Sequence, residues 1–478
     1  MKCSIGYKVL GLVTLALFAV AVMAQQGSTG TVSQQELVPR ATQAGHVFLP
    51  ESSKQQPAGF AHTNYVLSSV DGNKPAPMSA PTVRAIVSPS DVNPATIALT
   101  QMAETPNSMG CIYVKNPITA GCLPNVTGGG PSAAGYGAIV IVDAFDNPDA
   151  ASDLATFDAQ WPLPAANFTK IYANGDGACT TPPANAEWAM EESLDIEWAH
   201  VFAPKAAIVL VEACSNYDTE LFYAEQVAFN YIVTNYPAGG QVSNSWSGSE
   251  FSGQIADDPF FADFSYNGAD GYKTPILALV AAGDNGYGAQ YPSTSPWVIS
   301  AGGTSVYRKA TNDYYYSEGC WSGSGGGVSA QETYVTSWTG GNIGPWANFQ
   351  FPIFGQTARV TPDLAFNADP NSGVWFYSQY GLGGWAVVGG TSVSTPALAS
   401  IINRSNNRLG SVFLTPITSG GDYFNTEENN LIYSQLPTYA AYKTNFYDVK
   451  TGSNGGPKVG ASYDECTGVG TPRGLLGK

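Results

Sequence analysis

One serine-containing segment has the residue types that nucleophilic catalysis needs. The octapeptide Gly389–Pro396, with sequence GGTSVSTP, places Ser392 after two glycines and at the start of a helical pattern. Such a position can present the hydroxyl as a nucleophile, provided that a neighbouring group takes its proton. The chain contains three histidines, His46, His62 and His200, and two of these lie in an N-terminal stretch without other motifs. We therefore expect a group other than histidine to activate Ser392.

Two acidic residues on a predicted helix are candidates for this base. Glu191 and Asp195 are four positions apart, so both carboxylates project from the same helix face. A solvent-exposed acidic face is the alternative interpretation, but Leu194, Ile196 and Ala199 surround the pair with apolar positions. A buried carboxyl pair shares protons and separates its two pKa values. It can therefore act as a general base in mildly acidic solution.

A third acidic residue, Asp284, follows the apolar segment 280–282 and Gly283. An aspartate at this place can simply cap a turn. When it is protonated, it can also donate a hydrogen bond to an oxyanion, which requires a pKa above the working pH. The residues alone leave both interpretations open.

Taken in order, the three motifs resemble those of the sedolisin family of serine-carboxyl peptidases, which have a subtilisin-like fold. The resemblance rests on Glu-x-x-x-Asp, Gly-Asp and Gly-Thr-Ser-x-x-x-Pro, and it covers roughly residues 135–472. Further matching segments are GGGVS at 325–329, PDLA at 362–365, ADP at 368–370 and YPSTSP at 291–296. Each motif is weak alone, whereas the ordered set is specific.

The resemblance implies a role for each candidate. Ser392 would be the nucleophile, Glu191 its general base and acid, and Asp195 the residue that orients Glu191 and is coupled to its charge. Asp284 would supply the oxyanion-hole proton, together with the backbone N–H of Ser392. Near pH 4 an imidazole with a pKa of about 6.5 is protonated, whereas a glutamate with a pKa of about 4.3 is matched to the medium. The same acidity keeps Asp284 protonated.

The resemblance also implies one structural calcium ion near the C-terminus. Its ligands would be the side chains of Asp448 and Asp464 and the backbone carbonyls of Val449, Gly460 and Ser462. Ligands that are all oxygen suit Ca²⁺. Two aspartates in surface turns are the alternative interpretation.

Three other features have structural interpretations. His200 follows Asp195 by five residues, which rotates it away from the acidic helix face, so we expect a structural role. Asp143 ends the first predicted strand and has no histidine partner, so we assign it to structure or to support of the site. Glu187, Glu192 and Glu197 are interpreted as solvated or supporting. Residues 243–246, with sequence SNSW, resemble the strand that lines the substrate cleft of the family.

Alternating strands and helices must position these residues. Continuous apolar runs predict buried parallel strands at residues 137–143, 206–213, 275–282 and 297–301. Helical patterns cover 189–202, 219–235 and 391–403, and residues 377–388 predict a hairpin that leads into the serine turn. The alternation predicts an α/β fold with a doubly wound, mainly parallel sheet flanked by helices. With the resemblance, we expect a single large subtilisin-like catalytic domain.

The start of the chain predicts export. Residues 1–24 combine two lysines, an apolar run and a small-residue cleavage site, as a signal peptide does. Residues 25–105 are rich in Gln, Ser, Thr, Pro and Ala, and are interpreted as a short N-terminal segment or reduced prosegment. This is shorter than the folded prodomain that sedolisins usually carry. Residues 106–478 would form the catalytic domain with its calcium site.

Composition supports an extracellular protein. The formal charge is −17, although only 12% of residues are charged, and the chain has 53 Gly and 32 Pro. A surface so poor in Lys and Arg should not bind nucleic acid. Six of the seven cysteines lie after the signal peptide, which predicts up to three disulfides, with Cys111 and Cys122 as the expected local pair.

These observations predict a secreted, monomeric, acid-acting serine-carboxyl endopeptidase that forms an acyl-enzyme on Ser392. Its partners would be polypeptide substrates, with no nucleic acid and no membrane after signal removal. Three alternatives stay open: a tripeptidyl-peptidase-type exopeptidase, a subtilisin-type peptidase with His200 as base, and a catalytically silent surface-binding protein.

Overall fold

A computed structural model describes residues 46–69, 71–81, 84–85, 103–115, 122–124, 126–127, 134–174, 179–261, 276–309, 313–333, 358–406, 432–433, 436 and 439–476. The predicted signal peptide, residues 1–24, lies outside these residues. No helix in the described ranges is both long enough and apolar enough to cross a membrane.

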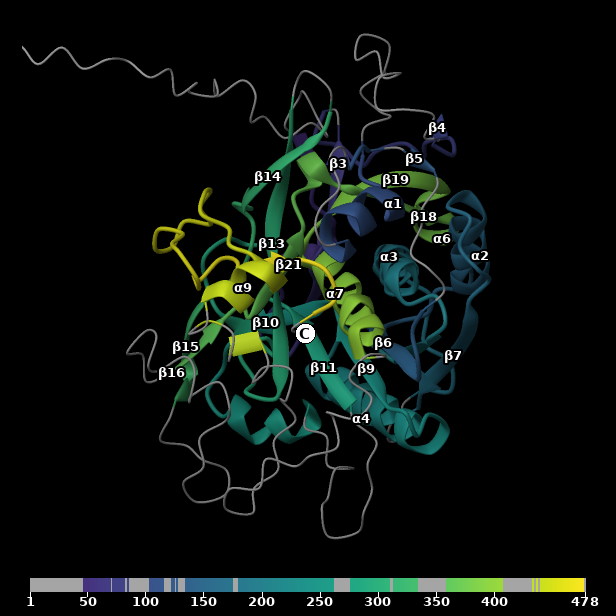
Figure 1. The fold of residues 1–478 in the computed structure, drawn as a ribbon. Helices are drawn as coiled ribbons and strands as arrows, with labels where there is room; N and C mark the ends of the chain where they lie inside the picture. Colours follow the sequence, from purple (N-terminus) through teal and green to yellow (C-terminus); the bar gives the residue numbers. More distant parts are fainter. Residues whose placement is uncertain are drawn as a thin grey trace, which may run out of the picture.

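The centre of the molecule is a mainly parallel sheet (Figure 1). In spatial order its parallel strands are β7 (Asn167–Ala173), β8 (Ala207–Ala213), β6 (Ala138–Ala144), β9 (Gly240–Asn244), β11 (Ile276–Ala281) and β13 (Val298–Arg308). Beyond them, β17 (Leu364–Asn367) pairs parallel with β13, and β14 (Tyr315–Cys320) closes the edge antiparallel. Every strand predicted from an apolar run is present, so the predicted α/β fold class is confirmed.

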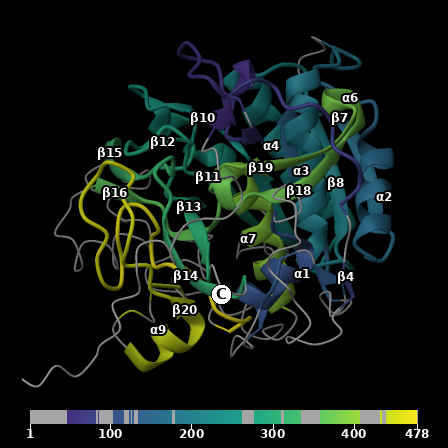
Figure 2. The same ribbon diagram turned by 90° about the horizontal axis from the view of Figure 1, so that it is seen from above.

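Helices cover both faces of this sheet. The helices are α2 (Ala150–Gln160), α3 (Ala186–Phe202), α4 (Asp218–Asn235) and α7 (Thr391–Asn406). Alternate residues of β6 divide between two cores, because side chains of a strand point to opposite faces. Ile139 and Ile141 belong to the core under α3 and α7, whereas Val140 and Val142 belong to the core under α4. Figures 1 and 2 show α3 and α7 side by side, with α2 beyond α3.

The predicted hairpin before the serine is also present. Strands β18 (Val374–Ser378) and β19 (Gly384–Gly389) pair antiparallel around the short helix α6 (Gln379–Leu382), and β19 leads directly to α7. The remaining elements are β4 (Arg84–Ala85), β5 (Val126–Thr127), β12 (Gln290–Tyr291), β15 (Gly327–Thr333), β16 (Ala358–Thr361), β20 (Phe446–Tyr447), β21 (Thr471–Pro472), α1 (Pro106–Met109) and α9 (Tyr439–Asn445).

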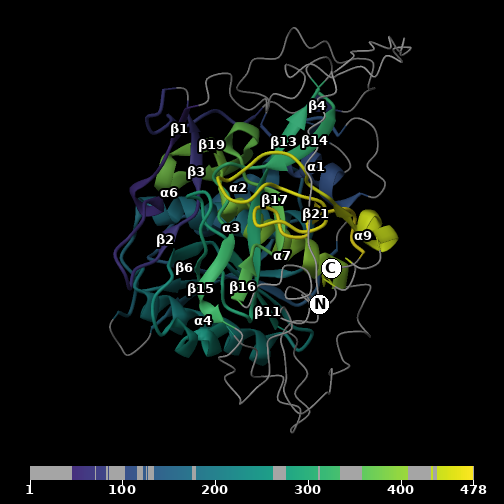
Figure 3. The ribbon, with the colours of Figure 1, turned by 90° about the vertical axis from the view of Figure 1, so that its left-hand side faces the viewer.

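Part of the N-terminal segment is built into the fold. It forms β1 (His46–Phe48), β2 (His62–Thr63) and β3 (Val66–Ser69). β3 pairs antiparallel with β19, as Figure 3 shows, and β2 pairs antiparallel with β10 (Trp246–Ser249). The low periodicity of residues 25–105 had not indicated strands there.

Three disulfides join the described parts of the chain. They are Cys111–Cys122, Cys179–Cys214 and Cys320–Cys466. The first is the expected local pair, and the third links β14 to the C-terminal region.

Candidate active site

Ser392 lies in the first turn of α7, where the local sequence constrains the backbone. Gly390 has φ +112°, and a Cβ there would lie 2.1 Å from the Asn64 carbonyl oxygen, so the position requires glycine. Pro396 has no N–H to donate to the Ser392 carbonyl, which instead accepts a hydrogen bond of 3.4 Å from Ser245 Oγ. The Ser392 side chain is fully buried, and its Oγ donates to the Ser245 carbonyl at 3.2 Å.

Glu191 and Asp195 approach Ser392 from α3. The helix begins at an Asn185 cap, whose side chain accepts hydrogen bonds from the backbone N–H of Glu187 and Trp188. Both carboxyl groups are fully buried, so their helix face is not solvated. Burial, with the nearby charges of Asp195 and Asp143, raises the pKa of Glu191 well above its usual range.

Contacts with hydroxyl groups oppose this effect of burial. The Ser392 hydroxyl approaches Glu191 and lowers its pKa, although its hydrogen bond in this structure goes to the Ser245 carbonyl. Ser245 Oγ donates to Asp195 Oδ1 at 2.9 Å. Burial still keeps the pKa of Asp195 well above its usual range, while contacts with Ser245 and Glu191 lower it. The structure thus brings the predicted nucleophile and both predicted carboxyl groups together.

More buried carboxyl groups surround this pair. Among the described residues, neither carboxylate oxygen of Asp143 or Glu192 has a hydrogen-bond partner. Burial raises the pKa of Asp143, and so do the charges of Asp195 and Glu212. The prediction that Asp143 supports the site agrees with this position. The interpretation of Glu192 and Glu197 as solvated is wrong, because both are fully buried.

Asp284 follows β11 and contacts the residue before the nucleophile. Its Oδ1 accepts two hydrogen bonds of 2.8 Å, from the backbone N–H and the hydroxyl of Thr391. Its Oδ2 is buried, and no described residue hydrogen-bonds to it. Burial raises the pKa of Asp284 to about 8, despite the lowering effect of Thr391. In mildly acidic or neutral solution Asp284 is therefore a neutral acid with one free O–H donor.

None of the three histidines is placed to act as the base for Ser392. His200 Nδ1 is 2.8 Å from Asp158 Oδ1 of α2, and the ring is fully buried. This pairing agrees with the predicted structural role. His62 lies in β2, where its Nδ1 is 3.1 Å from the Thr63 carbonyl, and His46 is exposed in β1.

The N-terminal segment passes directly over the nucleophile. The Ser392 backbone N–H, predicted to help form the oxyanion hole, donates to the Asn64 carbonyl at 2.9 Å. The Asn64 backbone N–H donates to the Ser245 carbonyl at 3.2 Å. Next to it, the Tyr65 hydroxyl donates to the Glu187 carbonyl at 2.9 Å. A peptide carbonyl of the same chain therefore occupies the position predicted for the oxyanion.

Comparisons with known proteins agree with this arrangement. The chain is 31% identical to kumamolisin from Bacillus sp. (strain MN-32) over 320 residues, 63% of this chain and 52% of the relative. It is 28% identical to xanthomonalisin from Xanthomonas sp. (strain T-22) over 271 residues, 52% of this chain and 28% of that relative. No family model matches the chain.

A solved structure of Pseudomonas sedolisin, a serine-carboxyl proteinase complexed with two molecules of pseudo-iodotyrostatin, has the same fold. It aligns with a TM-score of 0.56 and 20% identity, over 78% of this chain and 95% of that chain. The chain is thus similar to members of the sedolisin family in sequence, and to sedolisin itself in fold. It spans about half the length of kumamolisin and less than a third of that of xanthomonalisin. The similarity thus covers part of each of these relatives and not their whole length.

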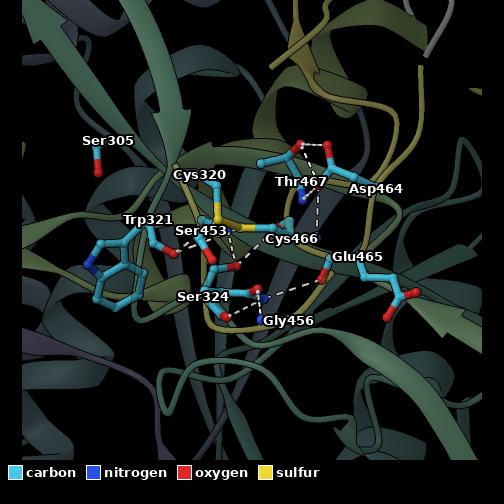
Figure 4. Close-up of a disulfide and its surroundings, with 12 residues drawn as sticks. Ser305, Cys320, Trp321, Ser324, Ser453, Gly456, Asp464, Glu465, Cys466 and Thr467 are labelled. Atoms are coloured by element: carbon cyan, nitrogen blue, oxygen red, sulfur yellow. Dashed lines mark hydrogen bonds between the residues drawn. A yellow bond between two sulfur atoms is a disulfide. The ribbon is translucent and has the colours of Figure 1, made fainter. Parts of the chain in front are cut away.

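Asp464, one of the predicted calcium ligands, lies beside the third disulfide. Figure 4 shows Asp464 and Thr467 next to Cys320–Cys466. Asp464 Oδ1 accepts hydrogen bonds of 2.9 Å from the backbone N–H of Cys466 and of Thr467. Burial, together with the charge of Asp448, raises the pKa of Asp464 to about 6, so the two carboxyl groups lie near each other.

The other predicted ligands make further contacts in this region. Asp448 Oδ1 accepts from the Ser462 N–H at 3.0 Å, and Lys450 Nζ is 2.8 Å from its Oδ2. The Ser462 carbonyl accepts from the Tyr442 hydroxyl at 2.8 Å and keeps a second lone pair. The described residues contain no group of three or more His, Cys, Asp or Glu side chains that could hold a metal. A site with two carboxylates and three carbonyls does not need such a group, and calcium stays a prediction.

Sequence reasoning did not predict the contacts that two residues make in the site. Ser245 contacts both Ser392 and Asp195, yet only its place in the SNSW segment singled it out. Asn64 lies in a segment without motif or periodicity, and only its backbone carbonyl meets Ser392. A backbone contact of this kind leaves no signal in residue types.

Proposed function

We propose that this chain is a secreted, acid-acting serine-carboxyl endopeptidase. The observation that supports it best is the group of buried carboxyls beside Ser392, with raised pKa values. A buried carboxyl pair without a counter-charge is costly for stability and is found where proton transfer is needed. The peptidase activity of the named relatives agrees with this use.

The proposed reaction passes through an ester on Ser392. Ser392 Oγ attacks the peptide carbonyl carbon while Glu191 takes the hydroxyl proton. The developing oxyanion accepts hydrogen bonds from the Ser392 backbone N–H and from Asp284 Oδ2–H. Glu191 then gives its proton to the leaving amine, and the C–N bond breaks. Water hydrolyses the ester by the same proton route in reverse.

The two acidic groups impose opposite pH requirements. The pair of Glu191 and Asp195 must lose one proton before Glu191 can accept another from Ser392. Asp284 must keep its proton, and its pKa of about 8 allows this throughout the acid range. Activity should therefore rise as the pair loses its first proton and fall as Asp284 ionises.

The path of the N-terminal segment favours an endopeptidase over a tripeptidyl peptidase. The chain continues without a break on both sides of Asn64, with β2 before it and β3 after it. A tripeptidyl peptidase has to end its cleft three residues before the cleaved bond. Here Phe60 and Ala61 continue the chain before β2, and the Ala61 N–H donates to the Asn216 carbonyl at 2.9 Å.

The other parts of the proposal follow from the sequence. Residues 1–24 would direct secretion, polypeptides would be the substrates, and the enzyme would act as a monomer. One calcium ion would be held by Asp448 and Asp464 with the carbonyls of Val449, Gly460 and Ser462. When bound, it would fix the C-terminal loops by its positive charge.

A pH–activity profile on a denatured protein substrate tests the proposal. For the wild type and for His200→Ala we expect activity that rises above the usual glutamate pKa of about 4.3 and falls as Asp284 ionises near its pKa of about 8, and we expect no turnover for Glu191→Gln. An alkaline maximum that is lost in His200→Ala would instead identify a subtilisin-type peptidase. No hydrolysis at any pH by wild type, with Ser392→Ala identical, would favour a silent binding protein.

A further inference from the structure

Residues 60–67 lie in the candidate active site in the manner of a bound peptide. Thr63 and His62 pair antiparallel with Trp246 and Ser247 of β10. On the other side of Asn64, Val66 pairs antiparallel with Gly389, three residues before Ser392. An extended peptide that adds a strand to a cleft edge is held in this way by backbone hydrogen bonds.

The carbonyl of Asn64 is at the reacting position. It accepts the Ser392 N–H, and a Cβ on Gly390 would lie 2.1 Å from this oxygen and 2.6 Å from Asp284 Oδ2. Both proposed oxyanion donors are thus beside the same carbonyl. The bond between Asn64 and Tyr65 takes the place of the bond to be cleaved.

The Asn64 side chain fills a polar pocket. Its Nδ2 donates to Ser247 Oγ at 2.9 Å and to the Ser245 carbonyl at 3.3 Å. Ser247 Oγ is also 3.2 Å from Asn64 Oδ1 and 2.5 Å from Gln290 Oε1. Asn64 and Ser247 are fully buried, and Gln290 is 8% exposed.

The pocket depends on a glycine beside Asp284. Gly283 has φ +106°, and a Cβ there would lie 2.4 Å from Gln290 Oε1. Gln290 can therefore reach Ser247 only because residue 283 has no side chain. The hydrogen-bond partners recorded for the Asn64 side chain are a hydroxyl and a carbonyl, both neutral.

We propose that Ser247 and Gln290 form a carboxamide-selective pocket, so that the enzyme cleaves peptide bonds after asparagine. This inference rests on the proposed peptidase function and adds its substrate class. The Asn64–Tyr65 bond of the chain itself would then be a substrate of this site.

Hydrogen bonding gives the expected selectivity. Leucine has a similar size but cannot make the amide hydrogen bond to the Ser247 hydroxyl, and losing the partner of a buried polar group is costly. The Ser245 carbonyl would keep its contacts with the residue 64 backbone N–H and the Ser392 hydroxyl and lose its third. Ionised aspartate has no donor for the Ser245 carbonyl. Asparagine is the side chain that satisfies both contacts.

Peptides that copy residues 60–67, with sequence FAHTNYVL, test the pocket on the full chain. We expect cleavage between Asn64 and Tyr65, with kcat/KM at least about tenfold higher than for matched peptides with leucine or aspartate at this position. In Ser247→Ala the ratio between the asparagine and leucine peptides should fall towards one. Equal rates for the three peptides, or a ratio that Ser247→Ala leaves unchanged, would overturn the proposal.

A second measurement does not depend on turnover. In the full chain carrying Ser392→Ala, Asn64→Leu should raise amide hydrogen exchange of β2 and β3 at least about tenfold, because the pocket no longer holds the segment. Asn73→Leu, at an exposed residue beyond the end of β3, is the control and should leave exchange of β2 and β3 unchanged. If no peptide is cleaved at any pH, the peptidase function fails, and the exchange result alone decides on the pocket. Unchanged exchange in Asn64→Leu would then reject it.

Discussion

Two buried acidic regions of this molecule differ in what surrounds their carboxyl groups. Asp363 accepts hydrogen bonds from the two terminal guanidinium nitrogens of Arg359, at 2.6 and 2.5 Å, and from the Tyr433 hydroxyl and the Ser300 N–H. Glu191, equally buried, has further acids as its charged neighbours, Asp195 and Asp143. Each carboxylate oxygen of Asp363 has hydrogen-bond donors, so the charged form is stabilised. Among the described residues Glu191 has no cationic partner, so its protonated form is favoured.

The difference separates a structural carboxylate from one that can transfer a proton. A fully paired carboxylate gains little from changing its protonation state, and removing its partner leaves an uncompensated charge. A buried acid without a cation has a pKa shifted towards neutrality and can gain or lose a proton within the working pH range. Substitutions that remove the charge at each place should therefore have opposite consequences.

Glu191→Gln should have the largest effect on activity. The amide cannot accept the Ser392 proton, so turnover should fall by at least roughly 10²–10⁴-fold. Unfolding by denaturant should show a stability equal to or above that of wild type, since no ion pair is lost. A variant that keeps activity within tenfold of wild type would mean that Glu191 is not the base.

Asp363→Asn should have the opposite effect to Glu191→Gln, with a large loss of stability. It leaves the Arg359 guanidinium buried without a counter-charge, which typically costs about 3–5 kcal/mol of unfolding free energy. Denaturant unfolding measures this loss beside Glu191→Gln as the control. If both variants have the stability of wild type, the contrast between the two regions does not hold.

The contrast also shows what the sequence can predict. The Glu191–Asp195 spacing and the apolar run before Asp284 predicted which side chains meet, because helix and strand periodicities fix their directions. The apolar runs predicted the central strands for the same reason. The strands of residues 46–69 were not predictable, because they are held by pairing with β10 and β19 and not by a pattern of their own. The burial of Glu192 could not be predicted from the sequence either, because it depends on how α3 packs in the fold.

Substitutions of Asp284 test whether a buried, neutral carboxylic acid donates a hydrogen bond to the oxyanion. Asp284→Ala removes one oxyanion donor and should cost about 2.7–4 kcal/mol of transition-state stabilisation, measured as kcat/KM. Asp284→Asn can still donate through its amide at any pH, so it should keep more activity and show a weaker alkaline fall. Equal activity of Asp284→Ala and wild type would place Asp284 outside the oxyanion hole.

The carboxyl groups of Asp448 and Asp464 are a third case. Here the predicted counter-charge is a bound calcium ion and not an arginine. If Asp448 and Asp464 hold calcium, a free concentration a hundredfold above its Kd stabilises the fold by about 2.7 kcal/mol. Chelation should lower the melting temperature of wild type, and added calcium should restore it. Asp464→Asn should respond less to either treatment. An unchanged melting temperature after chelation, with no calcium by elemental analysis, would remove the site.

The smallest expected effect is on how stability depends on pH. Because burial raises the pKa of folded Asp284 to about 8, the folded state holds a proton that the unfolded chain has already lost above its usual pKa near 4. Stability from this group is therefore full below about pH 4 and is lost as pH rises towards 8. Between pH 6 and 8 the contribution of Asp284 to this loss should be about 2 kcal/mol, so wild type should lose about that much more stability than Asp284→Asn, which does not titrate at this position. Denaturant unfolding at both pH values measures it, with Asp363→Asn as a variant that leaves the Asp284 titration in place. If wild type and Asp284→Asn lose the same stability over this range, Asp284 is not the buried neutral acid that the oxyanion role requires.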